Sequence, residues 1–410
     1  MMAQETEVHV ARQPIFDCNQ NVFGYELLFR SKVANAYDGT DGDHATNSVV
    51  ANSFLLIGME NLTNGKKAFI NFTANSLKNE IPSMLPKELI AVEILENIEP
   101  DQPVIAACQK LKQGGYCLVL DDFVFKPKFM PFVELADIIK VDFRLTPPDE
   151  RKALLDRCKN YPIKFLAEKV ETHADFQAAL QMGYSYFQGY FFCKPVVLSS
   201  KDIPSYKINY LSILREINQP YLEFSQLEAI IKRDVSLSYN LLKFINSAFF
   251  GLSNKIQSLR QALTLLGQKE LSKWASLMAL KGMGNHKPGE LILNSLVRAR
   301  FAENLAGINL SKQQTSNAFL MGMLSHLDAL LDRPLPEILK EIALDEEIKD
   351  ALLSIKPNRL GLIYKLMQAY ERGEWETISR FTRAMAIQEY QVSQSYQKAL
   401  IWAHEFINTN

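Results

Sequence analysis

The amino-acid sequence predicts a TIM-like (β/α) barrel followed by an all-helical domain. Two observations support this fold class. In the first 200 residues, short apolar runs alternate with amphipathic stretches of helix length, as in parallel strands joined by crossover helices. After residue 200 the strand signal disappears, and apolar residues recur at the three- and four-residue spacing of helices. We therefore expect two domains, residues 1–200 and residues 201–410.

The first domain contains a series of strand-like runs that favours a closed barrel. Amphipathic segments such as 103–112 and 173–182 lie between them. An open doubly wound sheet is the structural alternative, but it usually carries a glycine-rich phosphate loop after its first strand, and the sequence has none there. The predicted strands are 22–29, 68–72, 89–95, 117–120, 138–141, 163–167 and 186–192.

The second domain is predicted as consecutive helices. Leu237, Leu241, Leu242 and Ile245 show the spacing of one helix face, and prolines separate several segments. A polar stretch at 198–204 is the expected linker. The predicted helices are 206–217, 225–232, 237–247, 259–280, 291–307, 315–331, 336–343, 345–355, 360–371 and 377–407.

Composition narrows the cellular setting. The formal net charge is −1, so the chain as a whole has no attraction for nucleic acid or an anionic membrane. The five cysteines are scattered without CxxC spacing, which argues against a disulfide framework and a zinc site. Neither a signal-peptide core nor a bilayer-spanning apolar run is present. We expect a cytoplasmic protein that does not contact a membrane or nucleic acid. A weaker alternative is nucleic-acid contact through a basic face of Lys243, Arg260, Lys269 and Lys273.

Polar residues gather where the predicted strands end. In a barrel these ends lie on one face, which carries the functional site. The strand at 117–120 ends in Asp121 and Asp122, an adjacent pair that is unfavourable unless cations or donors compensate it. A helix-capping role is the alternative for an isolated pair. Other predicted strands also end in polar residues, which favours a cation-binding role for the pair. These residues are Glu26, Asn71, Glu93, Glu96, Lys140, Asp142, Glu168, Glu171 and Gln188.

The residue types at this face select the kind of cation. Carboxylate and amide oxygens suit Mg²⁺, Mn²⁺ or Ca²⁺ and do not suit zinc. A lysine among carboxylates can orient or deprotonate a water, or neutralise a phosphate. Two metals with a positioned water form a recurrent arrangement for phosphodiester hydrolysis. The sequence therefore predicts a divalent metal site on the barrel rim.

The motifs of residues 5–200 resemble those of the EAL-type domain, a family that hydrolyses or binds cyclic di-GMP. Glu26-Leu27-Leu28 stands where the family has Glu-Ala-Leu. The resemblance implies a bacterial signal-transduction protein. The matching motifs occur in the family's order at 11–16, 26–28, 70–73, 93–96, 121–123, 140–142, 167–172 and 187–192.

The resemblance also implies roles for individual residues. The cofactor would be Mg²⁺ or Mn²⁺, with Ca²⁺ as a bound but inhibitory ion. In the implied site the metal ligands are Glu26, Asn71, Glu93, Asp121 and Asp122, the catalytic residues Lys140 and Glu168, the substrate-binding residues Gln13, Arg30 and Gln188, and the supporting residues Glu96, Asp142 and Glu171.

The chain departs from the family pattern after Asp122-Phe123. Active members carry Gly-Thr-Gly-Tyr-Ser-Ser there, whereas this chain has Val-Phe-Lys-Pro-Lys-Phe at 124–129. Lys169 stands where glycine is usual, and Leu27 replaces the alanine of the signature. Glycines permit tight backbone conformations beside metal ligands, and catalysis depends on such positioning. We therefore expect a metal site, while hydrolysis is left open.

The second domain, residues 205–405, resembles the HDOD domain, a helical module related to metal-dependent HD phosphohydrolases. The resemblance rests on 236–248, 256–267 and 318–324. The hydrolases would have adjacent His-Asp after the last of these motifs. Here His326 and Asp328 stand two apart, about 200° around a helix, and cannot replace an adjacent pair. We expect His326 in a core or interface and the domain as a protein-interaction module.

Two function classes remain. The first is a cytoplasmic signalling protein whose divergent EAL-type barrel binds metal and cyclic di-GMP, or keeps only a vestigial site, and is coupled to the HDOD module. The second is an active cyclic di-GMP phosphodiesterase that releases linear pGpG under control of the HDOD half. The retained ligands favour hydrolysis, whereas the replaced loop favours binding alone. The expected partners are cyclic di-GMP, a protein that contacts the HDOD domain, and a second copy of the chain.

Overall fold

The structure is a computed structural model of the 410-residue chain. It describes residues 8–31, 62–193, 213–214, 216–217, 224–232, 238, 241–242, 244–246, 256, 258–283, 287–342 and 344–409. The chain divides into two compact units. The first contains residues 1–194 and 368–404, and the second contains residues 195–367 and 405–410.

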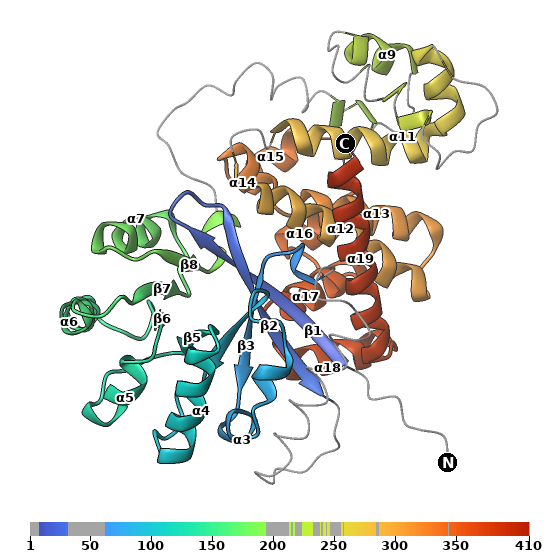
Figure 1. Ribbon diagram of the computed structural model, residues 1–410. Coiled ribbons are helices and arrows are strands. Elements are labelled where there is room, and N and C mark those ends of the chain that lie inside the picture. The colour runs from blue at the N-terminus through green and yellow to red at the C-terminus, as the bar shows by residue number, and fades with distance from the viewer. Residues whose placement is uncertain are drawn as a thin grey trace, which may run out of the picture. The chain divides into compact units, whose positions relative to one another are not determined.

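The first unit is built on a closed barrel of eight strands in sequence order (Figure 1), which confirms the predicted fold class. Strand β1 is antiparallel to both β2 and β8, and the other neighbouring strands are parallel. The predicted strands are all present, with ends shifted by a few residues, whereas β1 was not predicted. The strands are β1 Val8–Asp17, β2 Val22–Ser31, β3 Lys67–Phe72, β4 Ile90–Ile94, β5 Cys117–Leu120, β6 Ile138–Asp142, β7 Lys164–Glu168 and β8 Tyr186–Gln188.

Helices cover the outside of the barrel (Figure 1). Local signals fix where several of them begin: the Asp101 side chain accepts a hydrogen bond from Val104 N, and Thr172 and Asp175 form a reciprocal capping box. The helical segments are α3 Ala74–Lys78, η1 Ile81–Met84, α4 Gln102–Gln113, η2 Pro127–Phe129, α5 Met130–Val133, α6 Pro148–Cys158, α7 His173–Met182 and η3 Tyr190–Cys193.

One apolar layer fills the barrel interior. The side-chain period of a strand is two, so each strand sends alternate residues inward. Gly24 of β2 leaves space for this layer, because a Cβ there would lie 2.8 Å from Phe69 Cε2. The buried residues of the layer come from seven strands and are Ile15, Phe69, Ala91, Val119, Ile138, Leu166 and Tyr186.

The second unit is helical throughout its described residues, as predicted. Helix α17 crosses the division between the units at residues 367 and 368. The predicted linker, most of the helix at 206–217 and much of the helix at 237–247 lie outside the described residues. The helices are α9 Phe224–Lys232, α11 Leu259–Met283, α12 Gly289–Asn309, α13 Lys312–Leu324, α14 Leu327–Leu331, α15 Leu335–Glu341, α16 Glu346–Leu353 and α17 Arg359–Glu371.

The predicted helix 315–331 is interrupted, which changes the geometry expected for His326. Helix α13 ends at Leu324, and His326 is the residue before the first turn of α14. His326 and Asp328 therefore do not lie on one continuous helix. The His326 side chain is 3% exposed, and its Nδ1 lies 3.3 Å from Ser295 Oγ, so it is a core residue, as expected.

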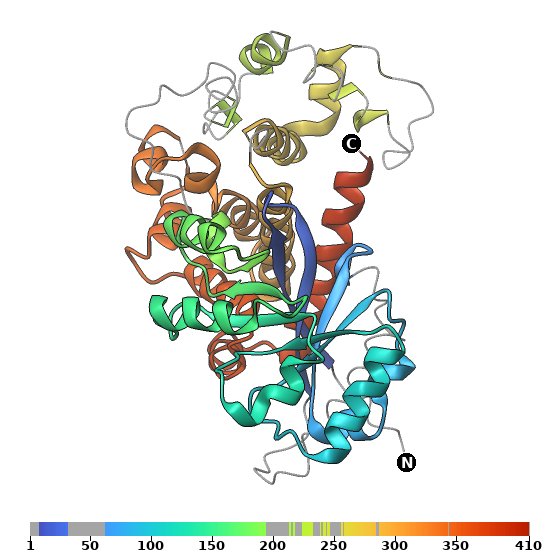
Figure 2. The same cartoon turned by 60° about the vertical axis from the view of Figure 1, so that its left-hand side comes forward.

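The C-terminal residues 368–404 belong to the same compact unit as the barrel. They include α18 Trp375–Met385 and most of α19 Glu389–Thr409. Tyr370 OH donates to Val10 O at 3.0 Å, and Arg12 Nη1 lies 3.3 Å from His404 Nε2. Figures 1 and 2 agree in placing this segment beside β1. The first unit is therefore discontinuous in sequence.

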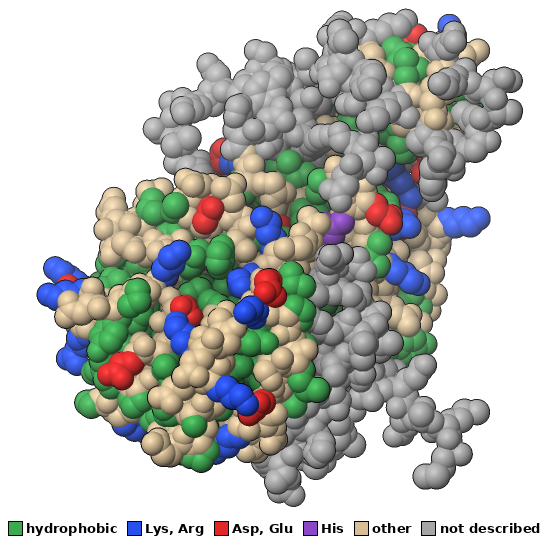
Figure 3. All heavy atoms as spheres, in the orientation of Figure 1, with side chains coloured by type: hydrophobic (Ala, Val, Ile, Leu, Met, Phe, Trp, Pro, Cys, Tyr) green, Lys and Arg blue, Asp and Glu red, His purple; other side chains and the backbone are tan. Residues whose placement is uncertain are grey.

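Two features concern the surface. Basic and acidic side chains are interspersed on the barrel face shown in Figure 3, in keeping with the net charge of −1. Among the described residues, no helix combines the length and the apolar character needed to cross a membrane.

Candidate active site

The candidate site lies one layer above the apolar filling of the barrel. Residues two positions apart on a strand face the same side. The residue two positions after each apolar filling residue therefore also faces inward, nearer the carboxyl end of its parallel strand. Glu26 occupies this position above Gly24, and Gln13 occupies it on the antiparallel β1. The other residues of this layer are Asn71, Glu93, Asp121, Lys140, Glu168 and Gln188. The barrel thus brings most of the predicted site residues into one ring.

Lys140 is the centre of the ring. Its side chain is fully buried, and its Nζ lies at ion-pair distance from four carboxylates. The distances are 2.7 Å to Asp121 Oδ1, 2.9 Å to Glu93 Oε1, 3.0 Å to Glu168 Oε1 and 3.5 Å to Glu26 Oε2. These five groups come from five strands, so the closure of the barrel itself assembles the cluster.

Burial and charge act in opposite directions on these groups. Burial lowers the pKa of Lys140, but the surrounding carboxylates, Glu168 first, outweigh it and hold the pKa well above its ordinary value. Burial raises the pKa of Glu93 well above its ordinary value, and Lys140 offsets this only in part. Burial likewise raises the pKa of Glu168 to about 8 against the attraction of Lys140. The single ammonium group therefore does not compensate the negative charge of the cluster.

The chemistry of the ring fits a divalent cation. Four carboxyl groups face one ammonium group, so their full ionisation would leave an excess of negative charge in a buried place, which a divalent cation would offset. Buried oxygens normally have a donor, and those in this region that lack an aligned hydrogen-bond donor are Asn71 Oδ1, Glu93 Oε1 and Oε2, Asp122 Oδ1, Glu168 Oε2 and Gln188 Oε1. Hard oxygens in this number suit Mg²⁺ or Mn²⁺.

The carboxylates surround the ammonium group of Lys140. They do not surround a common position for a metal ion. Within the described part of the chain, no three His, Cys, Asp or Glu side chains are already arranged as metal ligands. A cation at this rim would therefore share the carboxylates with the ammonium group. The residues present fit the ion in the chemistry of their oxygen atoms.

Glu26 is held by a row of side-chain amides. Asn71 Nδ2 donates to Glu26 Oε1 at 3.4 Å, and Gln188 Nε2 donates to Glu26 Oε2 at 2.6 Å. Gln188 Nε2 also lies 3.1 Å from Gln13 Oε1, and Gln13 Nε2 donates to Glu371 O at 3.3 Å. The end of α17 is thus connected to Glu26 through two glutamines, a connection that the sequence did not predict.

Gly189 fixes the position of Gln188. Its φ is 146°, and a Cβ there would lie 2.1 Å from Val170 O. Val170 N donates to Gln188 O at 3.0 Å on the same stretch of backbone. Any side chain at residue 189 would therefore push β8 away from β7 and displace the amide that holds Glu26.

Lys169 forms a second, more exposed ionic group. Its Nζ lies 2.5 Å from Asp142 Oδ2 and 3.5 Å from Asp122 Oδ2. Asp142 Oδ1 accepts hydrogen bonds from Arg144 N at 2.7 Å and Leu145 N at 3.0 Å. Burial raises the pKa of Asp142, but these donors and Lys169 outweigh it and hold the pKa below its ordinary value. Lys169 was noted in the sequence only as a departure from glycine, and its ionic role was missed.

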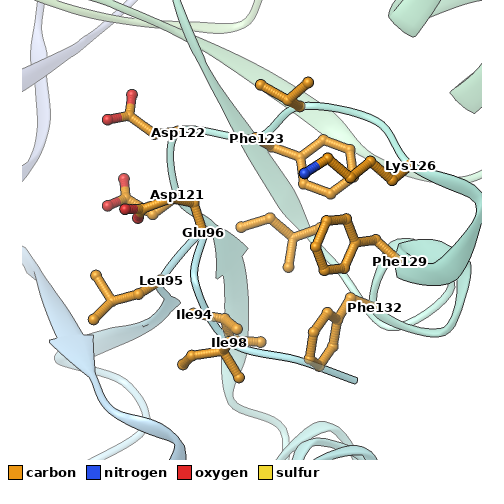
Figure 4. Close-up of a pocket in the computed structure, with 12 residues that line it drawn as sticks. Ile94, Leu95, Glu96, Ile98, Asp121, Asp122, Phe123, Lys126, Phe129 and Phe132 are labelled. Atoms are coloured by element: carbon orange, nitrogen blue, oxygen red, sulfur yellow. The ribbon is translucent and has the colours of Figure 1, made fainter. Parts of the chain in front are cut away.

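The loop that replaces the glycine-rich segment forms one wall of a cavity of about 140 Å³ (Figure 4). Phe123, Phe129 and Phe132 lie on one side, and the carboxylates of Asp121 and Asp122 lie on the other. Glu96, predicted as a supporting residue, lines the same cavity. The replacement loop is therefore a packed aromatic structure beside the acidic pair.

Among the predicted residues whose side chains the structure describes, Glu96, Asp122, Asp142 and Glu171 lie outside the ring. Glu171 pairs with Arg144 at 3.1 Å, and its side chain is 45% exposed. The backbone of Arg30 belongs to β2, while its side chain lies outside what the structure describes.

Both halves of the chain are similar in sequence to known proteins. The EAL domain model matches residues 54–195, and the HDOD domain model matches residues 203–388. The uncharacterized protein YuxH of Bacillus subtilis is 38% identical over 410 residues, which covers 98% of this chain and 99% of YuxH. The cyclic di-GMP phosphodiesterase CdgJ of Vibrio cholerae is 34% identical over 403 residues, covering 97% of this chain and 92% of CdgJ. The manganese and cyclic di-GMP complex of Klebsiella pneumoniae BlrP1 is 22% identical, with a TM-score of 0.37, and the match covers 46% of this chain and 56% of BlrP1.

Proposed function

We propose that this chain, which belongs to the family of proteins that join an EAL domain to an HDOD domain, is a metal-dependent phosphodiesterase acting on cyclic di-GMP. The convergence of four carboxylates on the buried Lys140 carries this proposal. The similarity to CdgJ, named as a cyclic di-GMP phosphodiesterase, extends over nearly the whole of both chains and supports the same substrate.

The residues divide the chemistry between them. Glu26, Asn71, Glu93 and Asp121 would hold a Mg²⁺ or Mn²⁺ ion, which as a Lewis acid polarises a phosphate oxygen and makes a bound water more acidic. Lys140 keeps the carboxylates together and offers an N–H donor to a water or a phosphate oxygen. Glu168 Oε2 lacks an aligned donor, which supports its proposed role as the acceptor of a proton from the attacking water.

The helical unit is proposed as a protein-interaction module and not as a second hydrolase. His326 is buried against Ser295, and Asp328 lies in the next helix, so the two do not form an adjacent ligand pair. The proposal is therefore a cytoplasmic signalling protein in which the barrel carries the chemistry and the helical unit receives or transmits the signal.

The test is hydrolysis by the purified full-length chain. Cyclic di-GMP is incubated with the protein and Mn²⁺ or Mg²⁺, and linear pGpG is measured by chromatography. Glu93→Gln and Lys140→Met should abolish the product, whereas Glu99→Gln should not, because Glu99 is a surface partner of Lys128. Binding of cyclic di-GMP without any product would identify a receptor instead of an enzyme. The absence of both cyclic di-GMP binding and product would refute the proposal.

A further inference from the structure

We propose that the ammonium group of Lys169 takes the place of a second divalent cation, so that this barrel holds one divalent ion beside a fixed lysine charge. The inference rests on the proposed function and deepens it, since it concerns how many ions the phosphodiesterase site takes. It starts from Lys169 Nζ, which lies 2.5 Å from Asp142 Oδ2 and 3.5 Å from Asp122 Oδ2.

Lys169 joins three neighbouring strand ends. Asp122 follows β5, Asp142 ends β6 and Lys169 follows β7, and these strands are adjacent in the barrel. The ammonium group therefore lies at the same rim as the carboxylate ring around Lys140. Two-metal hydrolases place two ions about 3.5–4 Å apart at such a rim. Lys169 contributes one positive charge to this region that belongs to the protein itself and not to a bound ion.

The Asp142 carboxylate beside Lys169 has little left to offer a metal ion. Asp142 uses Oδ1 for two backbone N–H groups and Oδ2 for Lys169. Asp122 has one oxygen near Lys169, and its other oxygen is buried without a hydrogen-bond donor. A divalent ion here would have to displace the lysine or lie against its positive charge.

The two ionic groups differ in their charge balance. Around Lys140, four carboxylates face one ammonium group, so a divalent ion reduces a large negative excess. Around Lys169, two carboxylates face one ammonium group, so a second divalent ion would convert a small negative excess into a positive one. Charge compensation therefore favours one ion at the ring and none beside Lys169.

The backbone conformation of Lys169 makes the test practicable. Its φ is 54°, in the left-handed region that glycine adopts without strain. Lys169→Gly removes the ammonium group while relieving this strain, so the variant should fold. Lys169→Met removes the charge at nearly constant length, and Lys169→Arg keeps the charge. Lys164→Met is the matched control, because Lys164 lies in β7 and contacts Tyr186 OH at 3.3 Å.

The experiment counts Mn²⁺ bound to the full-length chain by calorimetry, with free Mn²⁺ measured by electron paramagnetic resonance. We expect one ion per chain for the unmodified protein, Lys169→Arg and Lys164→Met, and two for Lys169→Gly and Lys169→Met. Thermal unfolding verifies that each variant is folded. Two ions in the unmodified protein, or one in both uncharged variants, would overturn this inference and leave the proposed function standing. No bound Mn²⁺ in the unmodified protein would overturn both.

Discussion

The contact between Arg12 and His404 predicts a pH-dependent stability that can be measured. His404 is half-buried in α19, and its Nε2 lies 3.3 Å from Arg12 Nη1. Burial, and then the positive charge of Arg12, lower the pKa of His404 from 6.5 to about 4. Arg12 can donate only to an unprotonated ring nitrogen. Protonation of His404 would therefore replace a hydrogen bond by two facing cations.

The sign and size of the effect follow from the shift in pKa. Between about pH 6.5 and pH 4, the unfolded chain carries a proton on His404 and the folded chain does not, so stability falls as the pH falls. For these two pKa values, the free energy of unfolding drops by about 2 kcal/mol between about pH 7.5 and pH 5. Because the side chain is only partly buried, solvent screening reduces the expected drop to about 1 kcal/mol.

The assay compares His404→Gln with the unmodified chain in urea unfolding at both pH values. Glutamine offers an acceptor to Arg12 but does not titrate, so the variant should lose about 1 kcal/mol less than the unmodified chain on acidification. Taking the difference between the two proteins cancels the titration of other groups. Parallel losses would show that His404 titrates as it does in the unfolded chain and that α19 is not docked on β1 as described.

Three further predictions concern the site itself. Gln13→Leu breaks the row of amides that ends on Glu26, and we expect Mn²⁺ affinity to fall about threefold to tenfold, the value of one hydrogen bond, in a titration of the folded variant. Glu93→Gln should weaken Mn²⁺ binding at least about tenfold while thermal stability at neutral pH stays constant or rises, because burial disfavours its charged form. Gly189→Ala should lower the free energy of unfolding by about 3 kcal/mol or more in urea, because its Cβ would overlap Val170.

Each of these changes has a matched control. Gln391→Leu removes a glutamine whose side chain accepts a hydrogen bond from Gln388 N at the start of α19, so it should not alter Mn²⁺ affinity. Glu99→Gln removes an exposed carboxylate and should leave metal binding unchanged. Gly65→Ala tests positive φ alone, because φ is 72° and no atom of the described residues lies within 4 Å of the added Cβ. Equal effects in a variant and its control would contradict the assigned contact.

The barrel and most of the ring could be predicted from sequence because every second side chain of a strand faces inward. An apolar residue that faces inward, such as Val119, fixes the direction of Asp121, and the same step leads from Ile138 to Lys140. Strand β1 was missed because Arg12, Gln13 and Pro14 interrupt its apolar pattern. Gln13 faces the site and Arg12 meets α19, so these polar residues are satisfied by distant segments.

Contacts that depend on unusual backbone or on distant packing could not be predicted. Lys169 reaches Asp142 from a left-handed conformation, which a lysine seldom adopts and which its residue type does not indicate. The helical pattern of α18 and α19 reveals an apolar face but not the surface it covers. The break after Leu324 occurs in a segment whose apolar spacing continues through it, so one helix was expected where the structure has two.

The discontinuity of the barrel unit determines the order in which this protein can be completed during synthesis. Strand β1 is synthesised before the other seven strands, but it pairs with β8, so the barrel cannot close until residue 188 has emerged. The surface of β1 that meets Tyr370 and His404 stays uncovered until the segment 368–404 is made, after the whole intervening helical unit. Such distant contacts slow folding. A fragment that stops after the barrel should therefore expose apolar surface and aggregate, although every strand of the barrel is present.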